Sequence, residues 1–337
     1  MKKTRVAING FGRIGRIFFR YAFGYPDLEF VTINDLGSPE NMAYLLKHDT
    51  VYGPYEKPVD FKDSELIVDG KSIRVISEEN PELLPWKDLD IDIVVESTGV
   101  FESRDKAAAH LTAGAKRVVI TAPAKDVVTP TATPNVGEEF LKNDKITSNA
   151  SCTTNAATPV MAVMAANPGV KKAVLNTVHA YTATQGLVDG PDKKNDFRRA
   201  RAAAQNIVPT TTGAAIAATK ALPSFAGKFD GISLRVPVIA GSIMDFTFVS
   251  ARETSVEEIN DIFKKAAKEK QWQGILAINE DPIVSSDILK NPNGSIVDLA
   301  MTRVIDGDLV KVMVWYDNEW GYASMLLKHV LAVSKLL

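Results

Sequence analysis

Cysteine and histidine are scarce in this chain. Its 337 residues include one cysteine, Cys152, and four histidines. A single cysteine cannot form an internal disulfide, and so few cysteines and histidines offer no zinc-type cluster. We therefore expect no metal site and a reducing, cytoplasmic compartment. The lone thiol is then either an inert, hydrophobic-like side chain or a reagent.

Net charge and long hydrophobic runs are lacking as well. The formal net charge is -2, so the overall charge does not favour nucleic acid or an anionic membrane as the main partner. The apolar stretch after the basic start, Val6–Ile8, is too short for a signal-peptide core, and no run approaches the length of a membrane span. With 45% hydrophobic and 24% charged residues, we expect a soluble protein of two domains.

The first part of the chain alternates short apolar runs with helical patterns, which is typical of a parallel sheet with crossover helices. An alanine-rich stretch, 102–111, predicts a helix that ends before Gly114. The predicted strands are 5–9, 30–34, 91–96, 118–121 and 146–148. We therefore predict an α/β fold in which residues 1–151 form a doubly wound, Rossmann-type domain.

After residue 151 the pattern changes to longer β-rich segments with few helices between them. The capping-box spacing of Ser255 and Glu258 predicts one helix, which extends to Lys270. The predicted strands are 173–181, 231–236, 243–251 and 309–316. We predict an α+β catalytic domain over 152–317 with a mostly antiparallel sheet and helices on one side. A C-terminal helical segment, 318–337, should complete the first domain.

A glycine motif follows the first predicted strand and opens an amphipathic helix. Its residues are Gly10, Phe11, Gly12, Arg13, Ile14 and Gly15. In this context the glycines permit a tight turn and the close approach of a pyrophosphate to the helix N-terminus, although glycines after a strand also serve plain turns. Asp35, 20 residues after Gly15 at the end of the next strand, is the residue expected on a ribose. Its charge would repel a 2′-phosphate, so NAD is favoured over NADP.

Cys152 lies after a short strand and before an apolar helix, 156–166, among small polar neighbours. A thiolate at a helix N-terminus is stabilised by free N–H groups, which can lower its pKa. His179, 27 residues later at the end of an apolar strand, is the candidate base, although an isolated histidine in a strand is often structural. The basic run Arg198–Arg201 is either an anion pocket or a solvated helix face.

These residues together resemble the phosphorylating glyceraldehyde-3-phosphate dehydrogenase family, and the resemblance covers essentially the whole chain. The matching runs are 9–16, 34–36, 96–99, 122–125, 148–155, 212–215, 234–237 and 315–322. The resemblance implies a glycolytic or gluconeogenic enzyme that uses NAD. Its Cys152 thiolate adds to glyceraldehyde 3-phosphate, His179 serves as base, and inorganic phosphate releases the resulting thioester as 1,3-bisphosphoglycerate.

The same resemblance implies the binding residues. Thr182 and Arg235 would form one phosphate site. The other phosphate site would comprise Ser151, Thr153, Arg199, Thr212 and Gly213. Cofactor contacts would come from the backbone of Arg13 and Ile14, and from Asp35, Ser97, Thr98, Gly99, Thr121, Asn318 and Tyr322. A long loop, 181–206, implies a homotetramer.

Five departures from the family pattern are visible. Ala156 replaces a usual second cysteine, Glu79 replaces an arginine near the adenine, and Ile216 replaces a lysine. The loop 189–197 is slightly longer than usual. The two prolines in 127–135 favour an edge or irregular segment over a central strand.

Two rival interpretations stay open. The first is an erythrose-4-phosphate dehydrogenase, a close relative that hydrolyses its thioester with water. The second is a non-enzymatic dinucleotide- or RNA-binding protein, which would have no need to keep Cys152, His179, Arg199 and Arg235 together.

Overall fold

The computed structural model describes residues 2–191 and 196–337, which form two compact units. Unit 1 contains the residues up to Ala132, 137–150 and 326–337, and unit 2 contains 133–136 and 151–325. The chain passes from unit 1 to the main part of unit 2 between Ala150 and Ser151, directly before the cysteine.

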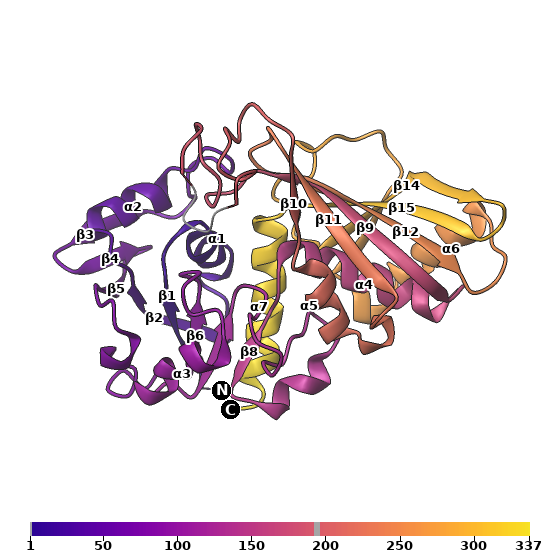
Figure 1. Cartoon of the computed structure of the whole chain (residues 1–337). Coiled ribbons are helices and arrows are strands. Elements are labelled where there is room, and N and C mark those ends of the chain that lie inside the picture. The colour runs from indigo at the N-terminus through magenta and orange to yellow at the C-terminus, as the bar shows by residue number, and fades with distance from the viewer. Residues whose placement is uncertain (1, 192–195) are drawn as a thin grey trace. The chain divides into compact units, whose positions relative to one another are not determined.

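Unit 1 is built on an eight-stranded sheet in the order β3-β4-β5-β2-β1-β6-β7-β8 (Figure 1). The pairs from β5 to β8 are parallel, and only β3-β4 and β4-β5 are antiparallel. The strands are β1 (Thr4–Asn9), β2 (Leu28–Asn34), β3 (Val59–Lys62), β4 (Glu65–Val68), β5 (Lys71–Ile76), β6 (Ile93–Glu96), β7 (Arg117–Ile120) and β8 (Ile146–Ser148). The predicted Rossmann-type sheet is confirmed, and β3 to β5 extend it beyond the prediction.

Helices connect the parallel strands of unit 1. They are α1 (Arg13–Ala22), α2 (Pro39–Lys47) and α3 (Arg104–Thr112), with short 3₁₀ helices η1 (Pro81–Leu83) and η2 (Glu138–Asn143). The amphipathic pattern of α1 buries Ile17, Phe18 and Phe19 completely. This packing anchors the helix whose N-terminus follows the glycine motif.

Unit 2 contains a seven-stranded sheet in the order β10-β11-β9-β12-β15-β14-β13 (Figure 1). Four pairs are antiparallel and two, β11-β9 and β13-β14, are parallel, so the predicted mostly antiparallel sheet is confirmed. The strands are β9 (Val170–Ala180), β10 (Val208–Thr211), β11 (Phe229–Val236), β12 (Ser242–Ser250), β13 (Leu276–Asn279), β14 (Ser295–Ile305) and β15 (Leu309–Tyr316).

The helices of unit 2 cover one face of that sheet. The inward residues Met244, Phe246 and Phe248 of β12 alternate with more exposed ones and share a core with apolar residues of α4, α5 and α6. The helices are α4 (Cys152–Ala166), α5 (Ala214–Ala221) and α6 (Val256–Ala266), with η3 (Pro223–Phe225) and η4 (Lys270–Trp272). The last helix, α7 (Trp320–Ser334), spans the division between the units.

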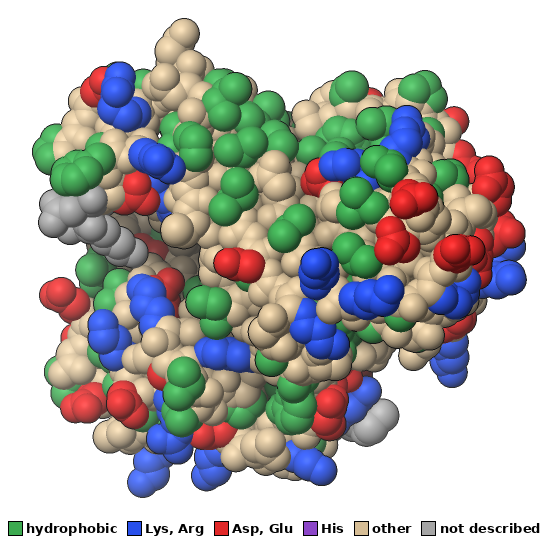
Figure 2. Space-filling model, turned by 45° about the vertical axis from the view of Figure 1, so that its right-hand side comes forward, with side chains coloured by type: hydrophobic (Ala, Val, Ile, Leu, Met, Phe, Trp, Pro, Cys, Tyr) green, Lys and Arg blue, Asp and Glu red, His purple; other side chains and the backbone are tan. Residues whose placement is uncertain are grey.

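Segment 127–135 is irregular, as its prolines predicted. It makes single β-bridges at Thr131 and Thr133 and belongs to no strand, and Val127 is 89% exposed. On the face of the molecule shown in Figure 2, basic and acidic side chains are interspersed with apolar ones. This mixture agrees with the small net charge.

Candidate active site

A cavity of about 480 Å³ opens in unit 1 where β1, β2 and β6 end. After β1 the chain turns to β2 on one side, whereas β6 pairs with β1 on the other. Crevices at such switch points are the usual ligand sites of open α/β sheets. The lining residues include Asn9, Gly10, Gly12, Asn34, Asp35, Glu78, Glu79, Ser97, Thr98 and Phe101.

The local structure explains each of the three glycines of the motif in a different way. Gly10 has φ +94°, and a Cβ there would lie 2.7 Å from the backbone nitrogen of Thr98. A Cβ on Gly15 would lie 2.2 Å from the Gly10 carbonyl oxygen. Gly12 precedes α1 without a side-chain cap, and nothing lies within 4 Å of where its Cβ would be. The helix N-terminus therefore offers open space beside its backbone, which suits a pyrophosphate.

Asp35 follows β2 and lines the cavity. One carboxylate oxygen accepts a hydrogen bond from the Phe11 N–H (2.6 Å) and the other from the Gly37 N–H (2.9 Å). The carboxylate keeps further lone pairs that can accept ribose hydroxyls. The lining residues include the carboxylates of Asp35, Glu78 and Glu79 and no lysine or arginine, which fits NAD better than a cofactor with an additional phosphate.

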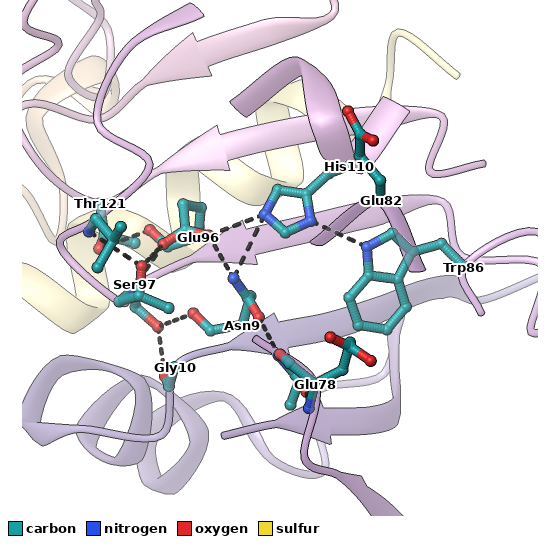
Figure 3. Close-up of polar contacts among 12 residues, drawn as sticks. Asn9, Gly10, Glu78, Glu82, Trp86, Glu96, Ser97, His110 and Thr121 are labelled. Atoms are coloured by element: carbon teal, nitrogen blue, oxygen red, sulfur yellow. Dashed lines mark hydrogen bonds and ion pairs between the residues drawn. The ribbon is translucent and has the colours of Figure 1, made fainter. Parts of the chain in front are cut away.

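The remaining predicted cofactor residues of unit 1 lie at the same ends of the strands (Figure 3). Ser97 Oγ donates to the Gly10 carbonyl (2.6 Å), and Thr121 Oγ1 donates to the Glu96 carbonyl (3.0 Å). Gly99 has φ +73° in the turn after β6. The Arg13 side chain pairs with Asp49. Phe11 is buried, and Ile14 is half-buried in α1.

Cys152 and His179 are brought together in unit 2. Cys152 is the first residue of α4, four residues earlier than predicted, and Ser151 caps the helix by accepting from the Thr154 N–H (3.1 Å). His179 lies near the end of β9, with its Nε2 3.3 Å from the cysteine Sγ. The pair has the contact that a nucleophile and its base require.

The hydrogen bonds of His179 define its proton acceptor. Its Nδ1 lies 2.6 Å from the Ala180 carbonyl oxygen, which can only accept, and 2.9 Å from Arg235 Nη1, which can only donate. We assign the proton to Nδ1, because the carbonyl contact is the shorter one and Arg235 Nη1 can donate to the same carbonyl oxygen instead (3.1 Å). Nε2 then presents its lone pair to the thiol. Burial and the nearby Arg235 charge lower the pKa of His179 to about 3, so the ring is neutral near pH 7.

The pKa of the Cys152 thiol is raised overall, although the sequence suggested that the helix N-terminus would lower it. Burial raises the pKa of the Cys152 thiol, although the Arg235 charge and contacts with Thr153 act in the opposite direction. Desolvation of the half-buried cysteine, whose sulfur lies against His179, outweighs these favourable effects. The thiol therefore depends on the base for its deprotonation.

Arg235 is an anion-binding candidate beside this pair. Residue 235 of β11 pairs with His179 of β9 in register, and its Nη1 donates to the Ala180 carbonyl (3.1 Å). Its Nε is buried and has no hydrogen-bond partner. A buried guanidinium with an unsatisfied donor is suited to a phosphate oxygen.

The other predicted phosphate residues fall into two groups. Thr182 and Arg199 are linked through Thr184: the two threonine hydroxyls lie 2.9 Å apart, and Arg199 Nη1 donates to Thr184 Oγ1 (3.4 Å). Thr212 Oγ1 accepts from the N–H of Ala214, the first residue of α5 (3.2 Å), and Gly213 between them is the N-cap residue of that helix. By contrast, the Ser151 hydroxyl is used as a helix cap. Thr153 is buried with its hydroxyl 2.9 Å from Tyr316 Oη.

Asn318 and Tyr322 are buried residues of unit 2. The Asn318 carbonyl oxygen accepts from the Gly241 N–H and from Ser242 Oγ, both at 3.0 Å, so only its amide nitrogen is left for a carboxamide. Burial raises the pKa of Tyr322, with a contribution from nearby Cys152.

Sequence reasoning missed Tyr316 and a group beneath the cavity. Tyr316 Oη lies 2.6 Å from Thr177 Oγ1, and its ring edge faces His179 at 6.0 Å between centroids. Beneath the cavity, Glu96 and His110 are buried together. Glu96 could have been found from its position directly before the turn at Ser97, whereas no feature of the sequence pointed to His110.

The departures from the family pattern have different locations. Ala156 is fully buried in α4, and Ile216 is 67% exposed on α5. Of the loop 189–197, residues 192–195 lie outside the described part of the chain. Arg201 pairs with Asp189 at the surface. Within residues 2–191 and 196–337, no cluster of metal-ligating side chains occurs and no helix is long and apolar enough to cross a membrane.

Two family models match the chain. One, described as "Glyceraldehyde 3-phosphate dehydrogenase, NAD binding domain", matches residues 4–104, and the other, its "C-terminal domain", matches 151–318. The chain is 48% identical over 325 residues to glyceraldehyde-3-phosphate dehydrogenase 2 of Streptomyces avermitilis (96% of both chains). It is 46% identical over 337 residues to the Zymomonas mobilis enzyme (99% of both chains) and 49% over 329 residues to that of Thermotoga maritima (96% and 97%).

Proposed function

Because the chain belongs to the glyceraldehyde-3-phosphate dehydrogenase family, an NAD-dependent oxidoreductase of glycolysis, we propose that Cys152 is its nucleophile and His179 its base. The observation that carries this assignment is the 3.3 Å contact between Cys152 Sγ and His179 Nε2. Arg235, within hydrogen-bond distance of the same imidazole, supplies a positive charge.

The first step forms a carbon–sulfur bond. Cys152 attacks the aldehyde carbon while His179 Nε2 accepts the thiol proton and then gives it to the aldehyde oxygen. The product is a hemithioacetal, which contains all the atoms of the thiol and of the aldehyde. Arg235 stabilises the sulfur as negative charge develops on it, and this compensates for the burial that raises the thiol pKa.

The second step oxidises this adduct to a thioester. His179 Nε2 takes the proton of the adduct's hydroxyl group, and NAD, when bound, would supply the acceptor for the hydride from the same carbon. For the cofactor itself, the glycine turn and the carboxylate of Asp35 would hold the pyrophosphate and a ribose. The tight glycine contacts and the unfilled space beside Gly12 support this fit.

The third step transfers the acyl group to inorganic phosphate. A phosphate oxygen attacks the thioester carbon and the carbon–sulfur bond breaks. The sulfur takes the proton that His179 accepted in the second step, which gives 1,3-bisphosphoglycerate and free Cys152. The buried, unpartnered Nε of Arg235 supports an anion site beside Thr182. Arg199, Thr212 and Gly213 are assigned to the second anion.

Phosphate dependence separates this route from hydrolysis of the thioester. We expect NADH formation from glyceraldehyde 3-phosphate to rise at least tenfold when phosphate is added, and erythrose 4-phosphate to be a poor substrate. Turnover with NAD that does not respond to phosphate would favour the erythrose-4-phosphate dehydrogenase alternative.

A homotetramer is the proposed assembly. Three large apolar side chains of the loop 181–206 are strongly exposed in the single chain: Leu187 (74%), Val188 (72%) and Phe197 (83%). The sheet face of unit 2 opposite its helices also exposes Val174 and Ile232. Analytical ultracentrifugation should give a species of four 36.6-kDa chains, and Leu187→Asp with Val188→Asp should shift it to smaller species. A monomer in the unaltered protein contradicts the proposal.

A further inference from the structure

A chain of buried hydrogen bonds runs from Trp86 to the base of the dinucleotide cavity (Figure 3). Trp86 Nε1 donates to His110 Nδ1 (3.0 Å), and His110 Nε2 lies 2.9 Å from Glu96 Oε2. Because Nδ1 accepts from the indole, the ring proton is on Nε2, and His110 donates it to the carboxylate. Trp86 and His110 are fully buried and Glu96 is 2% exposed.

Glu96 connects this chain to the residues that line the cavity. Its Oε2 also accepts from Asn9 Nδ2 (2.6 Å), and its Oε1 accepts from the Thr98 N–H (2.8 Å) and the Thr98 hydroxyl. Asn9 and Thr98 line the cavity, whereas Trp86, His110 and Glu96 do not. One buried carboxylate therefore holds two lining residues, one at the end of β1 and one in the turn after the neighbouring strand β6.

The turn held by Glu96 has little room to move. A Cβ on Gly10 would lie 2.7 Å from the Thr98 nitrogen, and Ser97 Oγ donates to the Gly10 carbonyl (2.6 Å). A change in the carboxylate orientation therefore displaces Thr98 against the glycine turn. A buried carboxylate that loses a donor reorients toward its remaining donors, since an unsatisfied charge in the core is costly.

We propose that Trp86 and His110 are positioning residues for NAD binding. Trp86 fixes the tautomer of His110, His110 fixes Glu96, and Glu96 fixes Asn9 and the Ser97–Gly99 turn at the cofactor. This inference rests on the proposed assignment of the cavity to the dinucleotide.

The test uses two substitutions of His110, each of which retains a polar group near a different ring nitrogen. His110→Gln retains a donor near the Nε2 position for Glu96, whereas His110→Asn retains a group near Nδ1 and loses that donor. The matched control is His329→Asn, because His329 is an equally buried histidine of unit 1 that contacts Thr147 and does not line the cavity. NAD binding to the whole enzyme is measured by calorimetric titration and compared with Tm, kcat and KM.

We expect His110→Asn to raise the Kd and KM for NAD at least tenfold, with kcat at saturating NAD within threefold of the unaltered enzyme. His110→Gln should have a Kd for NAD within threefold of that of the unaltered enzyme. His329→Asn should lower Tm about as much as His110→Asn does, while its Kd for NAD stays within twofold of that of the unaltered enzyme. Equal Kd values for His110→Asn and His329→Asn overturn the proposal. If His110→Asn does not fold, Trp86→Phe decides: a Kd raised threefold or more supports the inference, and a smaller change overturns it.

A variant in the cavity distinguishes an error in the positioning role of His110 from an error in assigning the cavity to NAD. Asp35→Ala removes a carboxylate that lines the cavity without touching the buried chain. If it leaves the Kd for NAD unchanged, the cavity is not the dinucleotide site and the premise fails. If it weakens NAD while the His110 variants do not, the positioning role alone is wrong.

Discussion

The two units build their sites in different ways. The cavity of unit 1 is lined by Gly10 and Gly12 of the glycine motif together with residues at the ends of neighbouring parallel strands. The site of unit 2 is formed by side chains far apart in the sequence, Cys152, His179 and Arg235, which helix and strand register bring together. The first site is suited to holding a ligand and the second to moving protons. The units should therefore respond separately to substitution.

Cys152→Ser should give the largest difference between the effect on kcat and the effect on the Kd for NAD. A serine hydroxyl has a much higher pKa than a thiol and is a weaker nucleophile at this position, so kcat should fall by about 10³-fold or more. The Kd for NAD should stay within twofold if the cavity is independent of the nucleophile. Steady-state assay and calorimetric titration measure the two quantities, and retained dehydrogenase turnover would refute the thioester route.

His179→Asn should reduce kcat by roughly 10²- to 10³-fold, the usual contribution of a positioned general base. Asparagine can still donate to the Ala180 carbonyl but has no group that accepts the thiol proton. Iodoacetamide modification of Cys152 at pH 7 should slow as well, because the thiol loses its proton acceptor. An unchanged rate of alkylation would show that His179 does not activate the sulfur.

His329 provides a comparison with His179, since it is a buried histidine without a thiol. Burial lowers its pKa to about 4, and Thr147 and Asn149 are its neighbours. An unfolded histidine titrates near 6.5, so between about pH 6.5 and 4 the unfolded chain binds a proton that the folded chain does not. Stability is therefore lost as the pH falls through this window, by about 2 kcal/mol at pH 5 from this residue.

The measurement is Tm from pH 7.5 to 4.5 for the unaltered chain and for His329→Gln. The variant should lose less Tm on acidification, although its Tm at pH 7.5 is lower. Parallel curves for the two proteins would mean that His329 titrates normally in the folded state.

The smallest expected effect concerns Glu79, at the cavity in unit 1. Glu79→Arg changes the local charge by two units. At a separation of about 8 Å in screened water this favours a 2′-phosphate by roughly 1 kcal/mol. The kcat/KM for NADP should therefore rise about fivefold, while that for NAD stays within twofold. Glu79→Gln is the intermediate control, and an NADP value unchanged by either variant would exclude a role for this charge.

The sequence was informative where neighbours in the chain are neighbours in space. Gly10–Gly15 and Asp35 could be assigned to one site because a strand end, a turn and a helix start are consecutive. The helix start beside Cys152 was inferred, but the raised pKa of its thiol was not, because that pKa depends on burial in the tertiary fold, which also brings His179 against the sulfur.

Register accounts for most of what was missed. Arg235 and His179 are partners because β11 and β9 are parallel neighbours, and that pairing is a tertiary property. The apolar residues of β3 to β5 form short runs that charged residues interrupt, so their alternation did not clearly indicate strands. Trp86 and His110 were invisible for a similar reason: each is an ordinary buried residue until the fold places its ring nitrogen against the other.

Ala156 determines how the enzyme responds to oxidative damage. It lies one helical turn after Cys152, at a position with no sulfur, and the chain has no other cysteine. A sulfenic acid formed on Cys152 therefore has no thiol in the same chain with which to condense. Its rescue depends on small thiols or reductases in the surroundings, and without them further oxidation to the sulfinic acid is a permanent loss of the enzyme.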